Sequence, residues 1–295
     1  MDQAARLREL VAERREGVGR VIAVASGKGG VGKTSIAVNL SLALAKKHQQ
    51  VMLLDADLGM ANVDILFGLV PRWDLTQVIK GERQLKEIIM PGPEGVLLIP
   101  GGSGVRELAD LSLEQQESLL QSLREVTSGM DFLLVDTSAG ISRQVLTFVA
   151  AAGEGIVVTT PEPTALTDAY GLIKGLSRLK VKLHLVVNRA VNLREGREAA
   201  ERLQAVAERF LSFKLSFLGV IPEDKAVSLA VRAQKPLLLY YPASAAARAI
   251  EELAERLLGL PVNGRGGTVF FQRLYSLLRS RAGLARVSLG REINT

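Results

Sequence analysis

The sequence predicts an α/β fold in which a doubly wound, mostly parallel β-sheet is flanked by helices. Short apolar runs, bounded by turn residues, alternate with longer stretches of helical character. Because these runs lack polar–apolar alternation, we expect strands that are buried on both faces, as in βαβ units. The expected strands are 21–26, 51–55, 95–100, 132–136, 155–160, 183–188 and 217–222, and the expected helices include 35–47, 113–127, 164–179, 194–210 and 243–258.

Composition supports a globular protein and excludes several kinds of site. The chain has 295 residues, 47% of them hydrophobic, and no cysteine. Disulfides, thiolate metal sites and cysteine-held iron–sulfur clusters are therefore excluded. Only two histidines occur, which argues against a histidine metal site. Residues 1–17 lack the apolar core of a secretory signal and no run of 18 apolar residues occurs, so we expect a cytoplasmic protein.

Positive charge is concentrated at the carboxyl end of the chain. Residues 262–295 contain six arginines against Glu292 alone, which gives +5 of the chain's net charge of +6. The remaining residues are therefore close to neutral. A basic tail indicates an anionic partner, either membrane lipid or nucleic acid.

A phosphate-binding loop follows the first expected strand. The segment Gly27–Thr34 matches G-x-x-x-x-G-K-[ST] and precedes an expected helix, the context that this motif requires. Glycines let backbone N–H groups approach phosphate oxygens, and the helix start adds partial positive charge. Lys33 can reach the β- and γ-phosphates, and the Thr34 hydroxyl can hold Mg²⁺. The expected nucleotide-binding residues here are Gly27, Lys28, Gly29, Gly30, Val31, Gly32, Lys33, Thr34 and Ser35.

Acidic residues end two of the expected strands. Asp136 closes 132–136, and Asp55 and Asp57 close 51–55 as D-x-D. Ligands of such sheets bind beyond the carboxyl ends of the strands, where Asp136 is placed to reach Mg²⁺ through water. The small residues of 136–140, "DTSAG", suit a loop that rearranges around a γ-phosphate. From spacing alone, Asp57 could be a solvated loop carboxylate, and Lys28 a solvated lysine on a mobile loop.

Several segments resemble the MinD/ParA group of ATPases. "KGGVGKT" at 28–34 is similar to the deviant Walker A loop of this group, and "DADLGMANVDILFG" at 55–68 resembles its first switch. "DTSAG" resembles the D-x-P-A-G second switch, with Ser138 in place of the usual proline. "GVIPEDKAVSLAVRAQKPL" at 219–237 resembles the late loop that packs on the base. The resemblance covers residues 20–258 and implies ATP and Mg²⁺ as cofactors.

The resemblance also implies roles for individual residues. Lys28 would reach across a dimer interface to the phosphates of the partner's nucleotide, and a second cation there would spread transition-state charge. Asp57 would orient the attacking water, which makes Lys28, Asp57 and Lys33 the expected catalytic residues. Thr34 would bind Mg²⁺ directly, with Asp55 and Asp136 acting through water.

Base recognition is implied by the same resemblance. Asn188, followed by Arg189 in "LVVNR", resembles the residue that reads adenine. The segment Pro222–Asp224 would line the base, so that Pro222, Glu223 and Asp224 join the expected site. Glu162 in "TTPEPT" would touch the nucleoside of the partner.

The amino terminus resembles one branch of the group. Residues 2–8, "DQAARLR", match the D-Q-A-x-x-L-R motif of the FlhG (FleN/YlxH) family and lie in an expected amphipathic helix. In that family the motif stimulates the GTPase of FlhF, an SRP-type protein that places flagella. The implied partner-binding residues are Asp2, Gln3, Ala4, Leu7 and Arg8. Alternatively, this helix packs on its own domain.

The carboxyl-terminal segment 268–281 predicts an amphipathic helix. At 100° per residue, large apolar residues gather on one side and most of the arginines on the other. This division fits an interfacial membrane helix and resembles the helix that ends MinD. Alternatively, the helix docks in a groove of its own domain, and both states can occur. The expected membrane-binding residues are Phe270, Phe271, Leu274, Leu277, Leu278, Arg273 and Arg279.

Together these features predict a partner-activating helix at 1–19, an ATPase domain at 20–259, a linker at 260–267, a membrane helix at 268–281 and a basic tail at 282–295. The resemblance implies a switch that dimerises with ATP at the inner face of the cell membrane and regulates flagellar number and placement. Its implied partners are a second copy, FlhF, acidic phospholipids and flagellar switch-complex proteins.

Two other functions stay open at this point. One is a MinD-like division-site or positioning ATPase, in which the amino-terminal helix is only structural. The other is a ParA-type DNA partition ATPase, against which the near-neutral body argues, since non-specific DNA binding needs many Lys and Arg contacts. Iron–sulfur carriers of related fold are excluded by the absence of cysteine.

Overall fold

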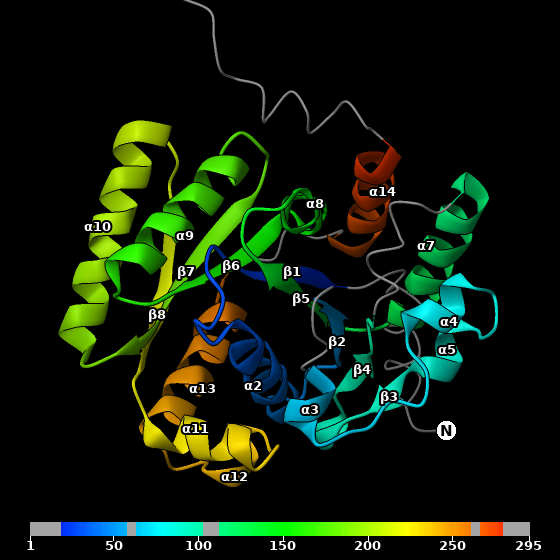
Figure 1. The fold of residues 1–295 in the computed structure, drawn as a ribbon, viewed down its shortest axis with the longest axis horizontal. Coiled ribbons are helices and arrows are strands. Elements are labelled where there is room, and N and C mark those ends of the chain that lie inside the picture. The colour runs from blue at the N-terminus through cyan, green and yellow to red at the C-terminus, as the bar shows by residue number, and fades with distance from the viewer. Residues whose placement is uncertain (1–18, 58–62, 103–111, 261–265, 280–295) are drawn as a thin grey trace, which may run out of the picture.

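The computed structural model describes residues 19–57, 63–102, 112–260 and 266–279, which form one sheet covered by helices on both faces (Figure 1). The strand order is β3-β4-β2-β5-β1-β6-β7-β8, and all described pairings are parallel except β3 with β4. The predicted doubly wound, mostly parallel sheet is therefore confirmed. The strands are β1 Arg20–Ser26, β2 Val51–Ala56, β3 Met90–Pro91, β4 Leu97–Ile99, β5 Phe132–Ala139, β6 Glu154–Thr159, β7 Lys182–Ala190 and β8 Ser216–Pro222.

Alternate residues of each central strand face two separate cores. In β1, Val21 and Ala23 point into one core while Ile22 and Val24 point into the other, and all four are buried. This two-sided burial explains why the strands read as continuous apolar runs. One core lies under α7 Leu113–Thr127, α8 Arg143–Ala152, α9 Pro163–Leu176, α10 Leu193–Leu211 and α14 Gly266–Arg279. The other lies under α2 Lys33–Lys46, α3 Val63–Phe67, α11 Lys225–Arg232, α12 Leu237–Tyr240 and α13 Ala245–Leu258.

Several helices and one strand differ from those predicted. The expected strand 95–100 shortens to β4 because Pro93–Gly95 form a 3-10 turn with Glu94 at φ 55°. Short helices α4 Leu75–Ile79 and α5 Leu85–Ile88 precede it. Helix α8 was not among the expected helices. Helix α14 begins at Gly266, so residues 266 and 267 belong to the helix rather than to the predicted linker.

Helix α14 lies between α7 and α8, with its apolar face turned into the core (Figure 1). Phe270 and Phe271 are each 1% exposed, and Leu274 is 2% exposed. Burial of such side chains stabilises by about 2 kcal/mol each. Of the two arrangements considered from the sequence, the docked one is therefore present in this structure. Leu277 and Leu278 are half-buried against the same core.

Polar contacts on the flanks of α14 complete the docking. The Tyr275 hydroxyl donates a hydrogen bond to Glu117 of α7. The guanidinium of Arg124 lies 6.0 Å from the ring centre of Phe271, within reach of a cation–π contact. Arg273, one of the predicted membrane-binding residues, lies against Gly153 at the carboxyl end of α8. A cation there interacts favourably with the helix dipole.

Some predicted segments lie outside the described residues. These are the whole partner-binding motif (Asp2, Gln3, Ala4, Leu7 and Arg8), most of the linker and the tail 282–295, together with the side chain of Arg279. Within the described ranges, the helices are all too short or too polar to cross a membrane.

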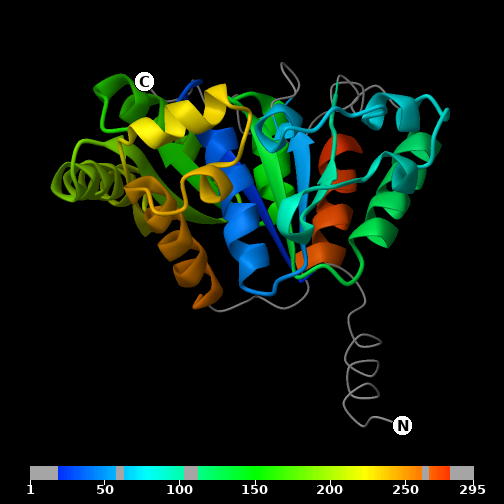
Figure 2. The same cartoon turned by 90° about the horizontal axis from the view of Figure 1, so that it is seen from below.

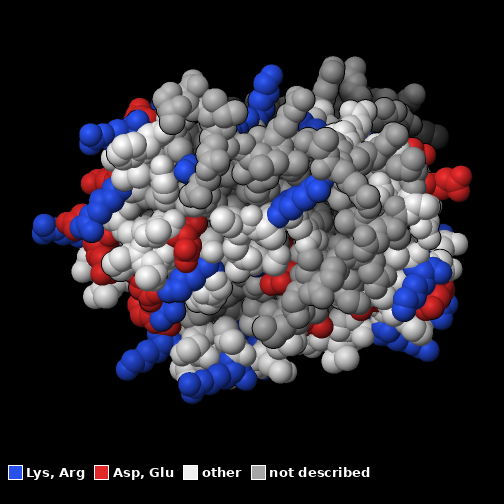
Figure 3. All heavy atoms as spheres, turned by 45° about the horizontal axis from the view of Figure 1, so that its top comes forward, with Lys and Arg blue, Asp and Glu red and all other residues white. Residues whose placement is uncertain are grey.

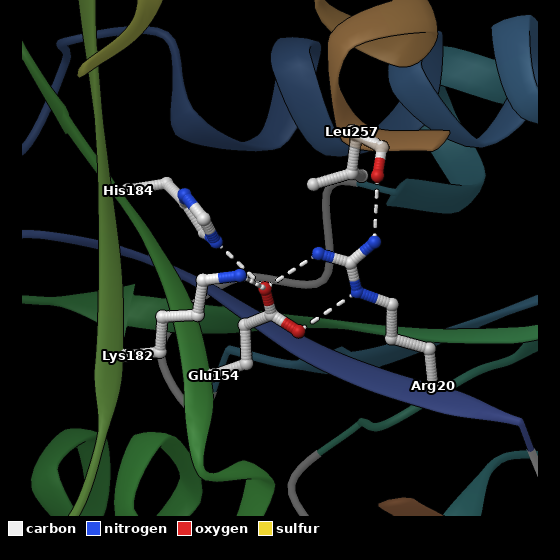
Figure 4. Close-up of polar contacts among 5 residues, drawn as sticks. All are labelled: Arg20, Glu154, Lys182, His184 and Leu257. Carbon is white, nitrogen blue, oxygen red and sulfur yellow. Dashed lines mark hydrogen bonds and ion pairs between the residues drawn. The ribbon is translucent and has the colours of Figure 1, made fainter. Parts of the chain in front are cut away.

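A buried charge cluster joins the amino ends of three strands (Figure 4). Arg20 of β1 donates from Nε and Nη2 to the Glu154 carboxylate of β6 at 2.8 and 2.6 Å, and from Nη1 to the Leu257 carbonyl at 2.7 Å. His184 Nε2 of β7 lies 2.6 Å from the same carboxylate, and the Lys182 ammonium lies 3.8 Å from it. Burial by itself would raise the pKa of Glu154, but hydrogen bonds and charge from Arg20 and His184 outweigh it and lower the pKa to about 2.

We expect Glu154→Gln to lower the Tm at pH 7 by roughly 5–10 °C, because it leaves the buried Arg20 without its counter-charge. The folded pKa lies below the ordinary value of 4.5, so the stabilisation is complete above pH 4.5 and is lost as the pH falls toward 2. The difference in Tm between wild type and variant should therefore shrink between pH 6 and pH 3. Glu252→Gln, in an exposed pair with Arg256, is the matched control and should change little. A difference independent of pH would contradict this account.

Candidate nucleotide-binding site

The loop between β1 and α2 has the backbone that phosphate binding requires. Gly30 and Gly32 have φ values of 78° and 91°, which side-chain-bearing residues rarely adopt. Gly32 is the N-cap of α2 and provides no capping side chain, so the first N–H groups of the helix are available to a ligand. A Cβ on Gly27 would lie 2.2 Å from the backbone of Asp168 in α9, so this glycine also permits close packing. The loop lies at the carboxyl edge of the sheet, at the opposite end from the start of α14 (Figure 2).

A buried ion pair connects this loop to the centre of the sheet. Lys33 Nζ donates to Asp136 Oδ1 at 2.7 Å, and the two side chains are 6% and 1% exposed. Thr34 Oγ1 lies 3.4 Å from the same ammonium. Asp55 and Asp136 are directly opposite each other on the neighbouring strands β2 and β5. The structure therefore brings together the residues that the sequence predicted for phosphate and metal binding.

The buried carboxylates of this site have too little positive charge around them. Burial, together with the Asp136 and Asp57 charges, raises the pKa of Asp55 to about 7 against opposing hydrogen bonds from the Asp57 and Val63 N–H groups. Burial also raises the pKa of Asp136, despite Lys33. The second oxygen of Asp136, Oδ2, is buried and accepts no hydrogen bond from the described residues. Lys33 pairs with Asp136, and Asp55 lies beside that pair with a raised pKa, which is a favourable environment for a further cation.

These residues fit Mg²⁺ held together with a nucleotide. Mg²⁺ prefers oxygen ligands, and in nucleotide sites it is bound by one or two side chains, waters and phosphates. The Thr34 hydroxyl would hold the ion, with Asp55 and Asp136 beyond its waters, where it would neutralise charge on the phosphates. Among the described residues, no group of three or more His, Asp or Glu side chains could hold a metal unaided.

The two residues predicted to contact the partner's nucleotide meet each other in the single chain. Lys28 Nζ lies 3.1 Å from Glu162 Oε2 and 2.9 Å from Thr164 Oγ1, and both charged side chains are well exposed. Glu162 is the N-cap residue of α9. Thr164 was missed in the sequence, where "TTPEPT" gives a turn but not its contact with the loop. The trans roles of Lys28 and Glu162 stay predictions.

The first switch is only partly within the described residues. Asp57 is the last described residue before 58–62, and its N–H donates to Asp55 Oδ1 at 3.0 Å. The second switch follows Asp136 and is held to the end of β1, since Gly140 N donates to the Ser26 carbonyl at 2.8 Å. The first switch starts at Asp55, opposite Asp136, and the second starts at Asp136 itself. Both switch segments thus begin beside the Lys33–Asp136 pair.

The residues predicted to line the base lie together at the ends of β7 and β8. Asn188 Nδ2 donates to the Val31 carbonyl at 2.8 Å. Arg189, at φ 56°, pairs with Glu223 at 2.9 Å, beside Pro222 at the end of β8. The carboxylate of Asp224 accepts from Ala226 N and Ala246 N at 2.9 and 3.1 Å, and so caps α11 and holds the first turn of α13. Asp224 therefore supports the base region as a structural residue.

A well-formed cavity among the described residues lies away from this loop. It has a volume of about 420 Å³ and lies between α7 and the α4–α5 segment, with Lys80, Arg83 and Glu125 among its lining residues. It contains none of the predicted site residues. The loop chemistry, rather than cavity size, therefore locates the nucleotide site.

Comparison with known proteins agrees with this geometry. The family model described as the CobQ/CobB/MinD/ParA nucleotide-binding domain matches residues 22–237, which include every residue of the site from Gly27 to Asp224. The chain belongs to this family. The MinD/ParA resemblance of the loop and switches is thereby confirmed, whereas the amino-terminal motif and α14 lie outside the matched range.

Individual MinD/ParA-family proteins are similar over most of the chain. The antiactivator FleN of Pseudomonas aeruginosa is 44% identical over 85% of this chain and 91% of its own length. The flagellum site-determining protein YlxH of Helicobacter pylori is 38% identical over 88% of this chain and 90% of its own. The cell division ATPase MinD of Pyrococcus furiosus has a similar structure, with a TM-score of 0.68 and 29% identity over 83% of this chain and all of that one. These relatives confirm the predicted resemblance to the FlhG (FleN/YlxH) branch.

Proposed function

We propose that this chain is an ATPase switch that dimerises with ATP, associates with acidic membrane and regulates the number and placement of flagella. The observation that carries the proposal is the Lys33–Asp136 pair inside a phosphate loop, with Asp55 alongside. This arrangement supports binding of Mg²⁺ and ATP. The flagellar role is supported by the similarity to FleN and to the flagellum site-determining protein YlxH.

Nucleotide binding would act first on the Lys33–Asp136 pair. A triphosphate would compete for the Lys33 ammonium, because it carries several negative charges where Asp136 carries one. The second switch starts at Asp136 and leads through Ser142, the N-cap of α8, into that helix. Helix α8 packs against α14, so a change at the switch has a direct route to the docked helix. Hydrolysis would then need Asp57 and, from the second chain, Lys28.

Release of α14 would provide the membrane contact. Undocking exposes Phe270, Phe271 and Leu274, with arginines on the flanks, and such a helix binds weakly to acidic lipid. Two helices in a dimer bind far more strongly than one, because the second contact is effectively intramolecular. The proposal therefore places the protein in the cytoplasm as a monomer and at the inner face of the membrane as the ATP dimer.

The amino-terminal motif would activate a partner GTPase. Residues 2–8 carry the FlhG-type sequence, and its proposed target is the SRP-type GTPase FlhF. Flagellar switch-complex proteins are further proposed partners. Each chain would thus combine an ATP-dependent membrane switch with a GTPase-activating segment.

A second candidate is a MinD-like positioning ATPase, which the structural similarity to the cell division ATPase MinD supports.

DNA partition is not proposed. On the face shown in Figure 3, the described Lys and Arg side chains are interspersed with Asp and Glu rather than gathered into a basic surface.

The membrane switch can be tested with Asp57→Ala, which should hydrolyse ATP slowly and stay in the ATP-bound state. We expect it to elute as a dimer in size-exclusion chromatography with ATP and as a monomer with ADP. We also expect it to sediment with acidic vesicles only with ATP. Adding Phe270→Glu should abolish sedimentation while the ATP dimer persists. Equal sedimentation with both nucleotides, or a monomer in ATP, would refute the switch.

The partner role can be tested by adding the protein to FlhF and measuring GTP hydrolysis. Wild type should stimulate hydrolysis several-fold, whereas Gln3→Ala and a chain lacking residues 1–17 should not. Arg6→Ala, at a variable position of the motif, is the matched control and should stimulate like wild type. Stimulation that survives the truncation, or its absence in wild type, would favour the MinD-like candidate.

A further inference from the structure

Asn188 connects a distant strand to the phosphate loop. It lies near the end of β7, which is separated from β1 by β6 in the sheet. Its side chain is 8% exposed, and Nδ2 donates to the Val31 carbonyl at 2.8 Å. The orientation of the amide follows from chemistry, because a carbonyl oxygen only accepts and the NH₂ group must face it.

The contact is tight and includes the end of the loop. A Cβ on Gly32 would lie 2.4 Å from Asn188 Nδ2, so the amide packs directly on the last glycine before Lys33. The Asn188 amide therefore touches both residues that precede the phosphate-binding lysine. Any displacement of this amide would be transmitted to the N–H groups that face the phosphates.

The backbone around Asn188 is held firmly. Arg189, the next residue, is in the left-handed region at φ 56°, which a non-glycine residue adopts only when its surroundings require it. Glu223 N donates to the Ala190 carbonyl at 2.8 Å, and the Glu223 carboxylate pairs with Arg189. The pairing of β7 with β8 shifts register between Val187 and Ala190, and Asn188 reaches the loop from this irregular segment, which the Glu223 N–H bond to Ala190 closes.

We propose that Asn188 is a positioning residue of the phosphate loop, which it holds in its phosphate-binding conformation through Val31, independently of any base. This role is additional to the base contact that the family resemblance implies, and it rests on the proposed function of the site. Because Nδ2 is committed to Val31, the amide oxygen is directed away from the loop. That oxygen is the atom left to accept from a base, so the loop contact and the implied base contact use different atoms of one amide.

The variant Asn188→Asp separates the two roles. It keeps an acceptor for adenine but replaces the donor with a carboxylate that repels the Val31 carbonyl. The decisive probe is inorganic triphosphate with Mg²⁺, which has no base, measured beside ATP and GTP by calorimetry. We expect the affinities for triphosphate and ATP to fall together by about tenfold or more, the loss expected for one buried hydrogen bond. The preference for ATP over GTP should persist.

Two further variants keep the test decisive. Asn192→Asp is the matched control, since Asn192 caps α10 as an acceptor from Glu195 N and aspartate can do the same. It should bind triphosphate like wild type. If Asn188→Asp does not fold, as judged by circular dichroism, Asn188→Ala is measured in the same way, because it also lacks the donor.

The outcomes distinguish this inference from the proposed function. If triphosphate affinity is unchanged while ATP affinity falls, Asn188 only reads the base and the inference is overturned. If wild type binds neither triphosphate nor ATP, the proposed function fails, and the inference with it.

Discussion

The ion pair between Lys33 and Asp136 is the interaction on which the site and its proposed output depend. It joins the phosphate loop to β5 in the middle of the sheet, where both side chains are almost fully buried. Removing one member of such a pair costs about 3–5 kcal/mol, because the other charge stays buried without compensation. The pair is thus stable only until a stronger anion approaches Lys33 and a cation approaches Asp136. Mg²⁺ and a triphosphate provide both at once.

Charged side chains at the amino ends of the strands differ in function from those at the carboxyl ends. At the amino edge, the Arg20–Glu154 cluster is fully hydrogen-bonded and joins β1, β6 and β7 to the end of α13. At the carboxyl edge, Asp55 and Asp136 are left with raised pKa values and too little positive charge. The first arrangement holds the strands in place. The second lacks positive charge, which a bound cation would supply. Helix α14 packs against α7, α8 and β1. Under the proposed function, its docking would respond to the nucleotide site through α8 without unfolding of the sheet.

Local sequence was sufficient to predict the sheet, the phosphate loop and the acids at the strand ends. These features depend on short-range patterns, such as the apolar runs or the spacing of Gly27, Gly32 and Lys33. Contacts between distant residues were not predictable. The bonds from Asn188 to Val31 and from Lys28 to Glu162 and Thr164 join segments more than 130 residues apart. The capping role of Asp224 likewise depends on α13 lying beside it. Amphipathicity predicted the helix α14 but not the surface against which its apolar face packs, because lipid and a protein groove bind the same face.

The central claim is that ATP at the carboxyl edge releases α14. Hydrogen–deuterium exchange of the Asp57→Ala protein, without membrane, measures this directly. With ADP, the amides of α14 should be protected by docking against α7 and α8. With ATP, exchange of residues 269–278 should become much faster, while that of α13 stays unchanged. Equal protection of α14 in ATP and ADP would contradict the account.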